Sequence, residues 1–188
     1  MKKLFLALGL VAASALASCA GGAVDAEKFA EEARKVEDHT YTEAVVKYEY
    51  DMDMLIAKDQ SKGEIKYTRD ETGGWTTESN DEHAEELKSN LEINVRSFNP
   101  SQALDGEEIP ENVEYDIKYY INPFKVTFSV KGSGESEDSK AKVDGKGEFK
   151  FEKYGYLSYC LTDMTVEGTA VGTSISMKMY QKLNISYK

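Results

Sequence analysis

The feature that most constrains the fold of this chain is a long alternation of apolar and polar residues. Over residues 46–56 every second residue is apolar, and up to Asp53 the residues between them are Lys, Glu or Asp. A period of two places alternate side chains on opposite faces of a β-strand. The segment therefore predicts a half-buried strand of about eleven residues, which is long for a strand.

The same period returns over most of the chain that follows. It predicts further strands at residues 65–67, 75–77, 113–121, 124–130, 141–151, 156–166 and 175–187. Residues that favour turns gather between them and predict turns or loops at 59–63, 73–74, 122–123, 132–139 and 153–155.

Two amphipathic helices are predicted before the C-terminal strands. In the first, Asp25 is the expected N-cap, and Val24 and Phe29 have the spacing of a hydrophobic staple. The second is predicted over residues 81–93, from a stripe of Ala84, Leu87 and Leu91. The sequence leaves two candidates for the N-cap of this helix. One is Ser79, which has Glu82 three residues later as in a capping box, and the other is Asn80.

These elements predict an α+β fold that is mainly β. An antiparallel sheet of about seven to eight strands with two helices accounts for the pattern, and one apolar face per strand implies either one covered side or a barrel. Gly145 and Gly147 lie on the apolar face. Either they weaken the strand or form a bulge, or they bend the sheet and leave room for a helix or a ligand.

The N-terminus has the pattern of an export signal. Lys2 and Lys3 precede 13 uncharged residues, 4–16, which is too short a run for a spanning helix. The run ends Leu16-Ala17-Ser18-Cys19. This motif resembles the bacterial lipoprotein signal, in which the chain is cut before the Cys and its thiol receives diacylglycerol. The alternative is an ordinary signal peptide with an incidental Cys.

The resemblance implies a division of the chain and an address. Residues 1–18 would be the signal peptide, 19–24 a lipidated tether and 25–188 a single mature domain. Cys19 would carry a covalent lipid, with no other cofactor, and hold the protein on the extracytoplasmic face of a cell membrane, the outer membrane included. Cys160 is then left without an intrachain disulfide partner, and we expect it to be a packed strand residue.

The order of tether, helix, long strand, helix and antiparallel strands is similar to that of the outer-membrane lipoprotein chaperones and the mycobacterial lipid-carrying lipoproteins. This resemblance implies a strongly curved sheet, an unclosed barrel, whose concave face is covered by the two helices. It also implies a lipid or acyl ligand between sheet and helices. Adaptable or aromatic side chains on the inner face are the candidate lining of that cavity: Tyr48, Tyr50, Met52, Met54, Val126, Phe128, Met177 and Met179. The same side chains could instead fill a core.

Other functions receive little support from the sequence. A net charge of −11 disfavours nucleic acid as a partner. We expect neither catalytic residues nor a metal site: His39 and His83 lie in separate segments, expected at the surface, and the sequence holds no nucleotide-binding or hydrolase motif.

The leading prediction is thus a monomeric, membrane-anchored lipoprotein that binds or carries a lipid or another apolar ligand in a cavity between the curved sheet and the helices. The alternative is a surface lipoprotein with a filled core that binds a protein or glycan, for which Tyr120, Tyr159 and Tyr180 would form an outward aromatic patch.

Overall fold

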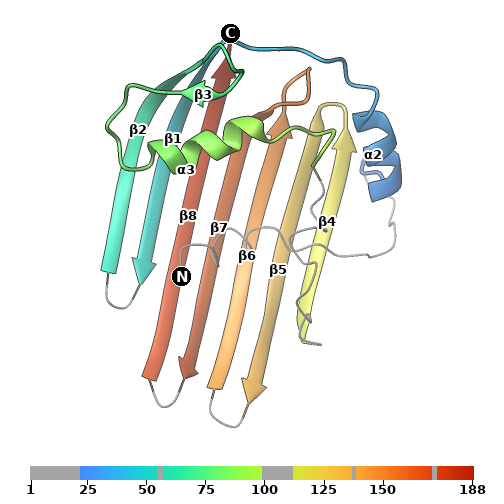
Figure 1. The fold of residues 1–188 in the computed structure, drawn as a ribbon. Coiled ribbons are helices and arrows are strands. Elements are labelled where there is room, and N and C mark those ends of the chain that lie inside the picture. Colours follow the sequence, from blue (N-terminus) through green and yellow to red (C-terminus); the bar gives the residue numbers. More distant parts are fainter. Residues whose placement is uncertain (1–21, 55–56, 99–111, 137–138, 171–172) are drawn as a thin grey trace.

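A computed structural model describes residues 22–54, 57–98, 112–136, 139–170 and 173–188. The signal segment 1–18 and Cys19 lie outside the described residues. The elements, in chain order, are α2 (Ala26–Ala33), β1 (Glu43–Met54), β2 (Ala57–Arg69), β3 (Trp75–Thr76), α3 (Ala84–Lys88), the 3-10 helix η1 (Ser89–Glu92), β4 (Val113–Ile121), β5 (Phe124–Ser136), β6 (Ser139–Phe151), β7 (Leu157–Ala170) and β8 (Thr173–Tyr187) (Figure 1).

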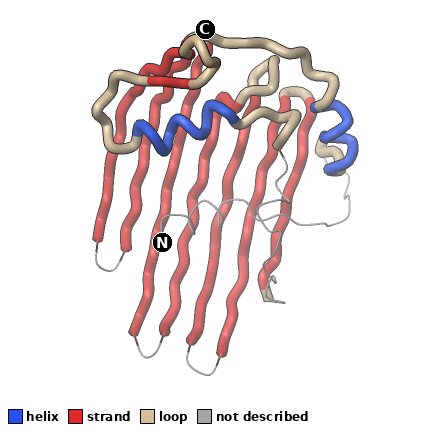
Figure 2. Tube along the Cα trace, viewed as in Figure 1, coloured by secondary structure: helices blue, strands red, loops and turns tan. Residues whose placement is uncertain are grey.

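All eight strands belong to one antiparallel sheet, in the order β3-β2-β1-β8-β7-β6-β5-β4. The sheet is open, with β3 and β4 as its two edges, and strands make up most of the trace in Figure 2. The predicted class, a mainly β chain with an unclosed antiparallel sheet and two helices, is confirmed. Every neighbour in the sheet is also a neighbour in sequence, except that β8 pairs with β1 and so lies in the interior of the sheet.

The strands are longer than their composition predicts. β1 and β2 stay in register from the pair Glu43 and Thr68 to the pair Met54 and Ala57, so the turn predicted at 59–63 is wrong. Side-chain pairs across the two strands hold this polar stretch: the Gln60 amide donates to the Asp51 carboxylate at 2.7 Å. The loop predicted at 132–139 is likewise too long, because β5 runs on to Ser136 and β6 starts at Ser139.

Helix α2 begins as predicted and is fixed to the β4 edge. The Asp25 carboxylate accepts from the backbone N–H of Lys28 at 2.8 Å, which satisfies a free donor of the first turn. Phe29 is buried, and its ring lies 5.2 Å from that of Tyr119 between ring centroids. Just before the helix, the backbone N–H of Val24 donates to the Tyr119 carbonyl at 2.8 Å.

The second helix lies across one face of the sheet (Figure 1). It is shorter than the predicted 81–93, because α3 spans five residues and then tightens into η1. Neither Ser79 nor Asn80 caps it: the N-cap is His83, which makes no side-chain capping bond. The Tyr67 hydroxyl instead fixes the first turn by donating to the Ala84 carbonyl at 2.8 Å.

The core lies beneath α3 and η1. One row of buried side chains, here called the core row, crosses six strands from β1 to β4 through successive register partners: Tyr48, Leu183, Cys160, Phe149, Val126 and Tyr119. Leu87 and Leu91 of the helical segment belong to the same buried cluster. The predicted packing of Cys160 is confirmed, and burial raises the pKa of its thiol to about 12.

Candidate functional site

The same face of the sheet continues beyond the core row for three further rows, which we call the distal apolar face. Residues two apart in a strand share a face, so these rows point the same way as the core row. Among the described residues no helix lies over them (Figure 1). By register, the rows from β1 to β4 are Tyr50, Gln181, Thr162, Gly147, Phe128 and Ile117; then Met52, Met179, Met164, Gly145, Val130 and Tyr115; then Met54, Met177, Val166, Val143, Gly132 and Val113.

The eight candidate lining residues divide into two sets in the structure. Tyr48, Val126 and Phe128 are buried, with exposed fractions of 7%, 1% and 9%. Tyr48 and Val126 belong to the core row, whereas Phe128 lies in the first row beyond it and packs into the same buried cluster. The other five are half-exposed and lie on the distal apolar face: Tyr50, Met52, Met54, Met177 and Met179. The first set fills a core, and only the second set is placed to touch a ligand.

The half-exposed methionines form a compact group on two neighbouring strands. Met52 is the register partner of Met179, and Met54 is that of Met177. Met164 on β7 is the register partner of Met179 but is buried. Methionine is unbranched, flexible and polarizable, so a surface made from it can adapt to apolar molecules of different shape.

The two inward-facing glycines leave room that a neighbouring side chain already occupies. A Cβ added at Gly147 would lie 2.1 Å from Cε1 of Phe128, whose ring covers that position. At Gly145 the nearest atom to such a Cβ would be Cγ of Met164, at 2.8 Å. The sharper prediction, that these glycines make space for a helix or a ligand, is therefore wrong for Gly147, because Phe128 fills the space.

A polar border closes the distal apolar face on the β2 side. Asp59 is the register partner of Met52, and Ser61 is that of Tyr50. The Ser61 hydroxyl lies 2.7 Å from Nε2 of His83, whose ring contacts that of Tyr50 at 5.7 Å between centroids. His83 was expected at the surface, and it is half-buried instead. No sequence signal brought Ser61 and His83 together, because the register of the long hairpin places them.

His39 also differs from its expected surface position. Its ring stacks on that of Tyr154, with centroids 4.1 Å apart and an interplanar angle of 13°. Tyr41 meets both rings edge-on and donates from its hydroxyl to the Glu152 carboxylate at 2.9 Å. This cluster joins the segment before β1 to the β6–β7 turn and has a structural role.

Little space remains between the helix and the sheet. The cavity there has a volume of about 10 Å³, bounded by α3 on one side and by β1 and β8 on the other, and its lining includes Tyr50, His83 and Gln181. Such a volume holds about one water molecule. A cavity of this size has no room for an acyl chain under α3. In the rows beyond α3, Phe128, Val130, Thr162 and Met164 are also buried. Tyr50 and the methionines of β1 and β8 are partly exposed there, so a ligand can contact them.

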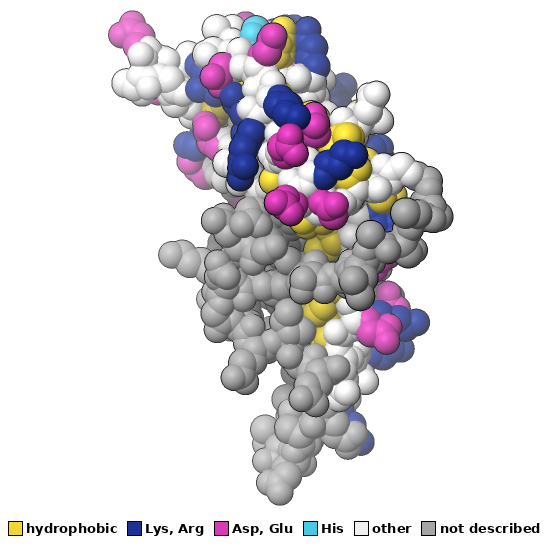
Figure 3. Space-filling model, turned by 90° about the vertical axis from the view of Figure 1, so that its right-hand side faces the viewer, with side chains coloured by type: hydrophobic (Ala, Val, Ile, Leu, Met, Phe, Trp, Pro, Cys, Tyr) yellow, Lys and Arg dark blue, Asp and Glu magenta, His cyan; other side chains and the backbone are white. Residues whose placement is uncertain are grey.

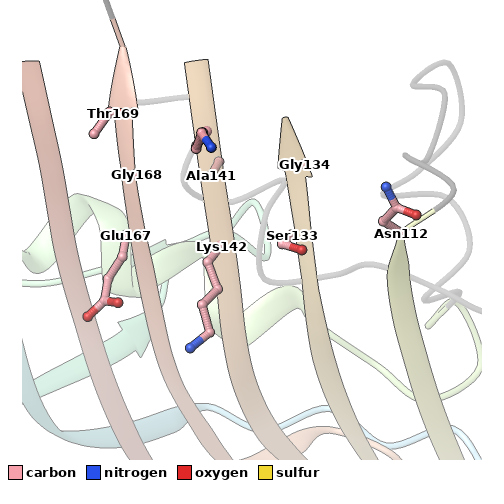
Figure 4. Close-up of a pocket in the computed structure, with 9 residues that line it drawn as sticks. Asn112, Ser133, Gly134, Ala141, Lys142, Glu167, Gly168 and Thr169 are labelled. Atoms are coloured by element: carbon pink, nitrogen blue, oxygen red, sulfur yellow. The ribbon is translucent and has the colours of Figure 1, made fainter. Parts of the chain in front are cut away.

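A larger depression lies at the far end of the strands (Figure 4). Its volume is about 470 Å³, and β5, β6 and β7 supply most of its lining. Lys142 and Glu167 are register partners there, and their side chains extend from neighbouring strands toward the same side (Figure 4). The depression is open and lined largely by polar, charged or small residues, so it lacks the enclosing apolar walls of a typical ligand pocket.

The outward tyrosines do not form one patch. The Lys125 ammonium lies 4.2 Å from the Tyr120 ring centroid, and the Lys150 ammonium lies 4.6 Å from that of Tyr159. These two lysines are register partners and separate the two rings. Tyr180 lies in another row, opposite Asp163.

The described residues contain no group of three or more His, Cys, Asp or Glu side chains that could hold a metal ion. Within the same part of the chain, none of the helices has the length and apolarity needed to cross a bilayer. No family model, curated protein or solved structure matches this chain.

Proposed function

We propose that this protein is a lipid-anchored extracytoplasmic lipoprotein whose distal apolar face binds an acyl chain or a similar apolar ligand. The lipid on Cys19 holds the chain to a membrane, and residues 1–18 direct its export. The helix-bearing face of the sheet is the concave one in this proposal. The ligand lies on the rows beyond α3, and not between α3 and the sheet as the family resemblance implies.

The observation that carries the proposal is the exposure of the five inner residues. Tyr50 and the four methionines Met52, Met54, Met177 and Met179 stay half-exposed on the face whose other half forms the core. Covering apolar surface gains about 25 cal/mol per Å², so a ligand that covers this group is stabilised by its contacts. The flexible thioether chains let the same surface accept ligands of different length.

A fatty acid labelled with a dansyl group tests this binding on the chain from residue 20 onward. The dye fluoresces more strongly when it leaves water, so titration gives a Kd. Met179→Glu places a charge on the distal apolar face, and we expect it to weaken binding by about tenfold or more, which corresponds to about 1.4 kcal/mol. The matched control is Lys178→Glu, because its exposed side chain is on the opposite face of β8.

Circular dichroism on both variants establishes that they keep the sheet. If the unsubstituted chain does not enhance the dye, or if both variants bind it equally well, the distal apolar face is not a ligand site.

The alternative, a surface lipoprotein with a filled core, draws support from one observation. The cavity beneath α3 is only about 10 Å³, so that half of the inner face is packed by its own side chains. A partner protein or glycan would then bind elsewhere on the surface. Failure of the dye titration favours this alternative over lipid binding.

A further inference from the structure

We propose that the β4 edge of the sheet faces the membrane that holds the anchor, and that an acyl chain of a lipid in that membrane reaches the distal apolar face across this edge. The inference rests on the proposed function, because it assumes that Cys19 is lipidated. It adds an orientation and a route, neither of which the anchor alone provides.

The length of the tether limits which edge can approach the membrane. The backbone N–H of Val24 donates a hydrogen bond to the Tyr119 carbonyl on β4, and Val24 is five residues along the chain from Cys19, with four residues between them. Consecutive Cα atoms lie 3.8 Å apart at most, so the tether spans no more than about 19 Å. β3 pairs only with Thr68 and Arg69 of β2, so β2 itself forms the edge beside the distal rows. This β2 edge lies six strands away from β4, which is about 29 Å at the usual strand spacing. The tether is therefore too short for the sheet to stand on its β2 edge.

The rows of the distal apolar face become more polar from the β4 end to the β2 end, so the polarity also favours β4 as the edge next to the membrane. At the β4 end the rows begin with the apolar side chains of Val113, Tyr115 and Ile117. At the β2 end the Met52 row reaches Asp59 and the Tyr50 row reaches Ser61. Figure 3, which looks onto the β4 side, shows hydrophobic side chains lying between and below groups of charged ones.

An acyl chain that crossed β2 along the Met52 row would have to pass the Asp59 carboxylate. Burying an ionised carboxylate against hydrocarbon costs far more than burying any side chain at the β4 end of the rows. An acyl chain that crosses β4 meets apolar side chains first and reaches the methionines without passing a charge. The tether and the polarity of the rows thus point independently to the same edge.

Two surface lysines allow a matched test of the orientation. Lys118 on β4 and Lys62 on β2 lie in one register row on the same outer face, at opposite ends of the sheet. Lys118→Cys and Lys62→Cys accept a thiol-reactive fluorophore selectively, because Cys160 is buried and Cys19 carries the lipid. The processed, lipidated protein is incorporated into phosphatidylcholine vesicles with and without a nitroxide on the lipid headgroup, which quenches nearby fluorophores.

We expect the fluorophore at residue 118 to lose much of its intensity in nitroxide vesicles, while the fluorophore at residue 62 keeps most of it. A flexible Gly-Ser insertion of twelve residues between Gly21 and Gly22 should reduce this difference, because the longer tether no longer fixes the edge. Equal quenching at both sites, as for a sheet that lies flat, or stronger quenching at residue 62 overturns the orientation alone. A protein that does not float with the vesicles overturns the orientation and the proposed anchor together.

Discussion

A hydrogen bond between distant residues fixes the start of the covering helix. The Tyr48 hydroxyl on β1 donates to Oδ2 of Asp81 at 2.5 Å, and Oδ1 of Asp81 accepts from the backbone N–H of His83 at 2.9 Å. The Tyr48 bond is the main cause that holds the pKa of Asp81 below its usual value. Burial, together with this bond, raises the pKa of Tyr48 to about 12.

Tyr48→Phe should lower the free energy of unfolding by about 1 kcal/mol at neutral pH, because it removes a hydrogen bond to a half-exposed carboxylate. An Asp with a lowered folded pKa stabilises above its unfolded pKa of about 4, and this stabilisation is lost as the pH falls through the folded value. The difference between variant and parent should therefore shrink in acid. Urea unfolding at neutral and acid pH measures it.

Tyr50→Phe is the control, since the Tyr50 hydroxyl makes no hydrogen bond within the described part of the chain. A stability difference for Tyr48→Phe that stays constant from neutral to acid pH would show that the charge of Asp81 is not involved.

Local sequence signals predicted the structural role of a residue only where the residues it contacts are close to it in the chain. The Asp25 cap and the 153–155 turn were predicted correctly, and Gly155 has the positive φ of 83° that such a turn requires. Tyr48 and Asp81 are 33 residues apart, and Ser61 and His83 are 22 apart. Their contacts depend on strand register and on the path of α3, so no local pattern indicates them.

At the scale of elements, the alternation of apolar and polar residues predicted the extent of the strands better than the presence of residues that favour turns. The polar stretch at residues 59–63 continues β2 because its partner strand still alternates and pairs with it residue for residue. In β6, the pattern correctly placed Gly145 and Gly147 on the inner face, and the structure adds that each is covered by a side chain from a neighbouring strand.

Gly147→Ala should destabilise the sheet by about 1 to 3 kcal/mol, because the new methyl group would overlap the Phe128 ring and approach the Leu161 carbonyl oxygen at 2.7 Å. Gly134→Ala on β5 is the matched control, since a Cβ there meets nothing within 4 Å. Thermal unfolding of both variants compares them. Equal midpoints would mean that the Phe128 ring moves aside without cost.

At the scale of the whole molecule, the sequence predicted the fold class but not the order of the strands. Period-two patterns show that strands form and which side chains share a face. They do not say which strands are neighbours, and the pairing of β1 with β8 joins segments more than a hundred residues apart. The division of the inner face into a covered and an exposed half follows from this arrangement and from the position of α3.

The proposed lipid anchor also concerns the whole molecule. If Cys19 is lipidated as proposed, Cys19→Ala should release the protein from membranes or block its processing, because two or three acyl chains, at about 0.8 kcal/mol per buried methylene, would provide the attachment. Cell fractionation and metabolic labelling with a fatty-acid analogue measure this. A Cys19→Ala protein that still incorporates the label would show that the lipid is attached elsewhere.

The interior position of β8 has a consequence for how the chain completes its fold. Strands β1 and β2 precede β8 by more than a hundred residues, so the hairpin that they form must wait for the last strand before it can join the rest of the sheet. A chain translocated from its N-terminus would hold three strands, β3, β2 and β1, apart from the four strands β7 to β4 until its final segment emerged. Loss of β8 would therefore divide the sheet in two rather than trim one edge.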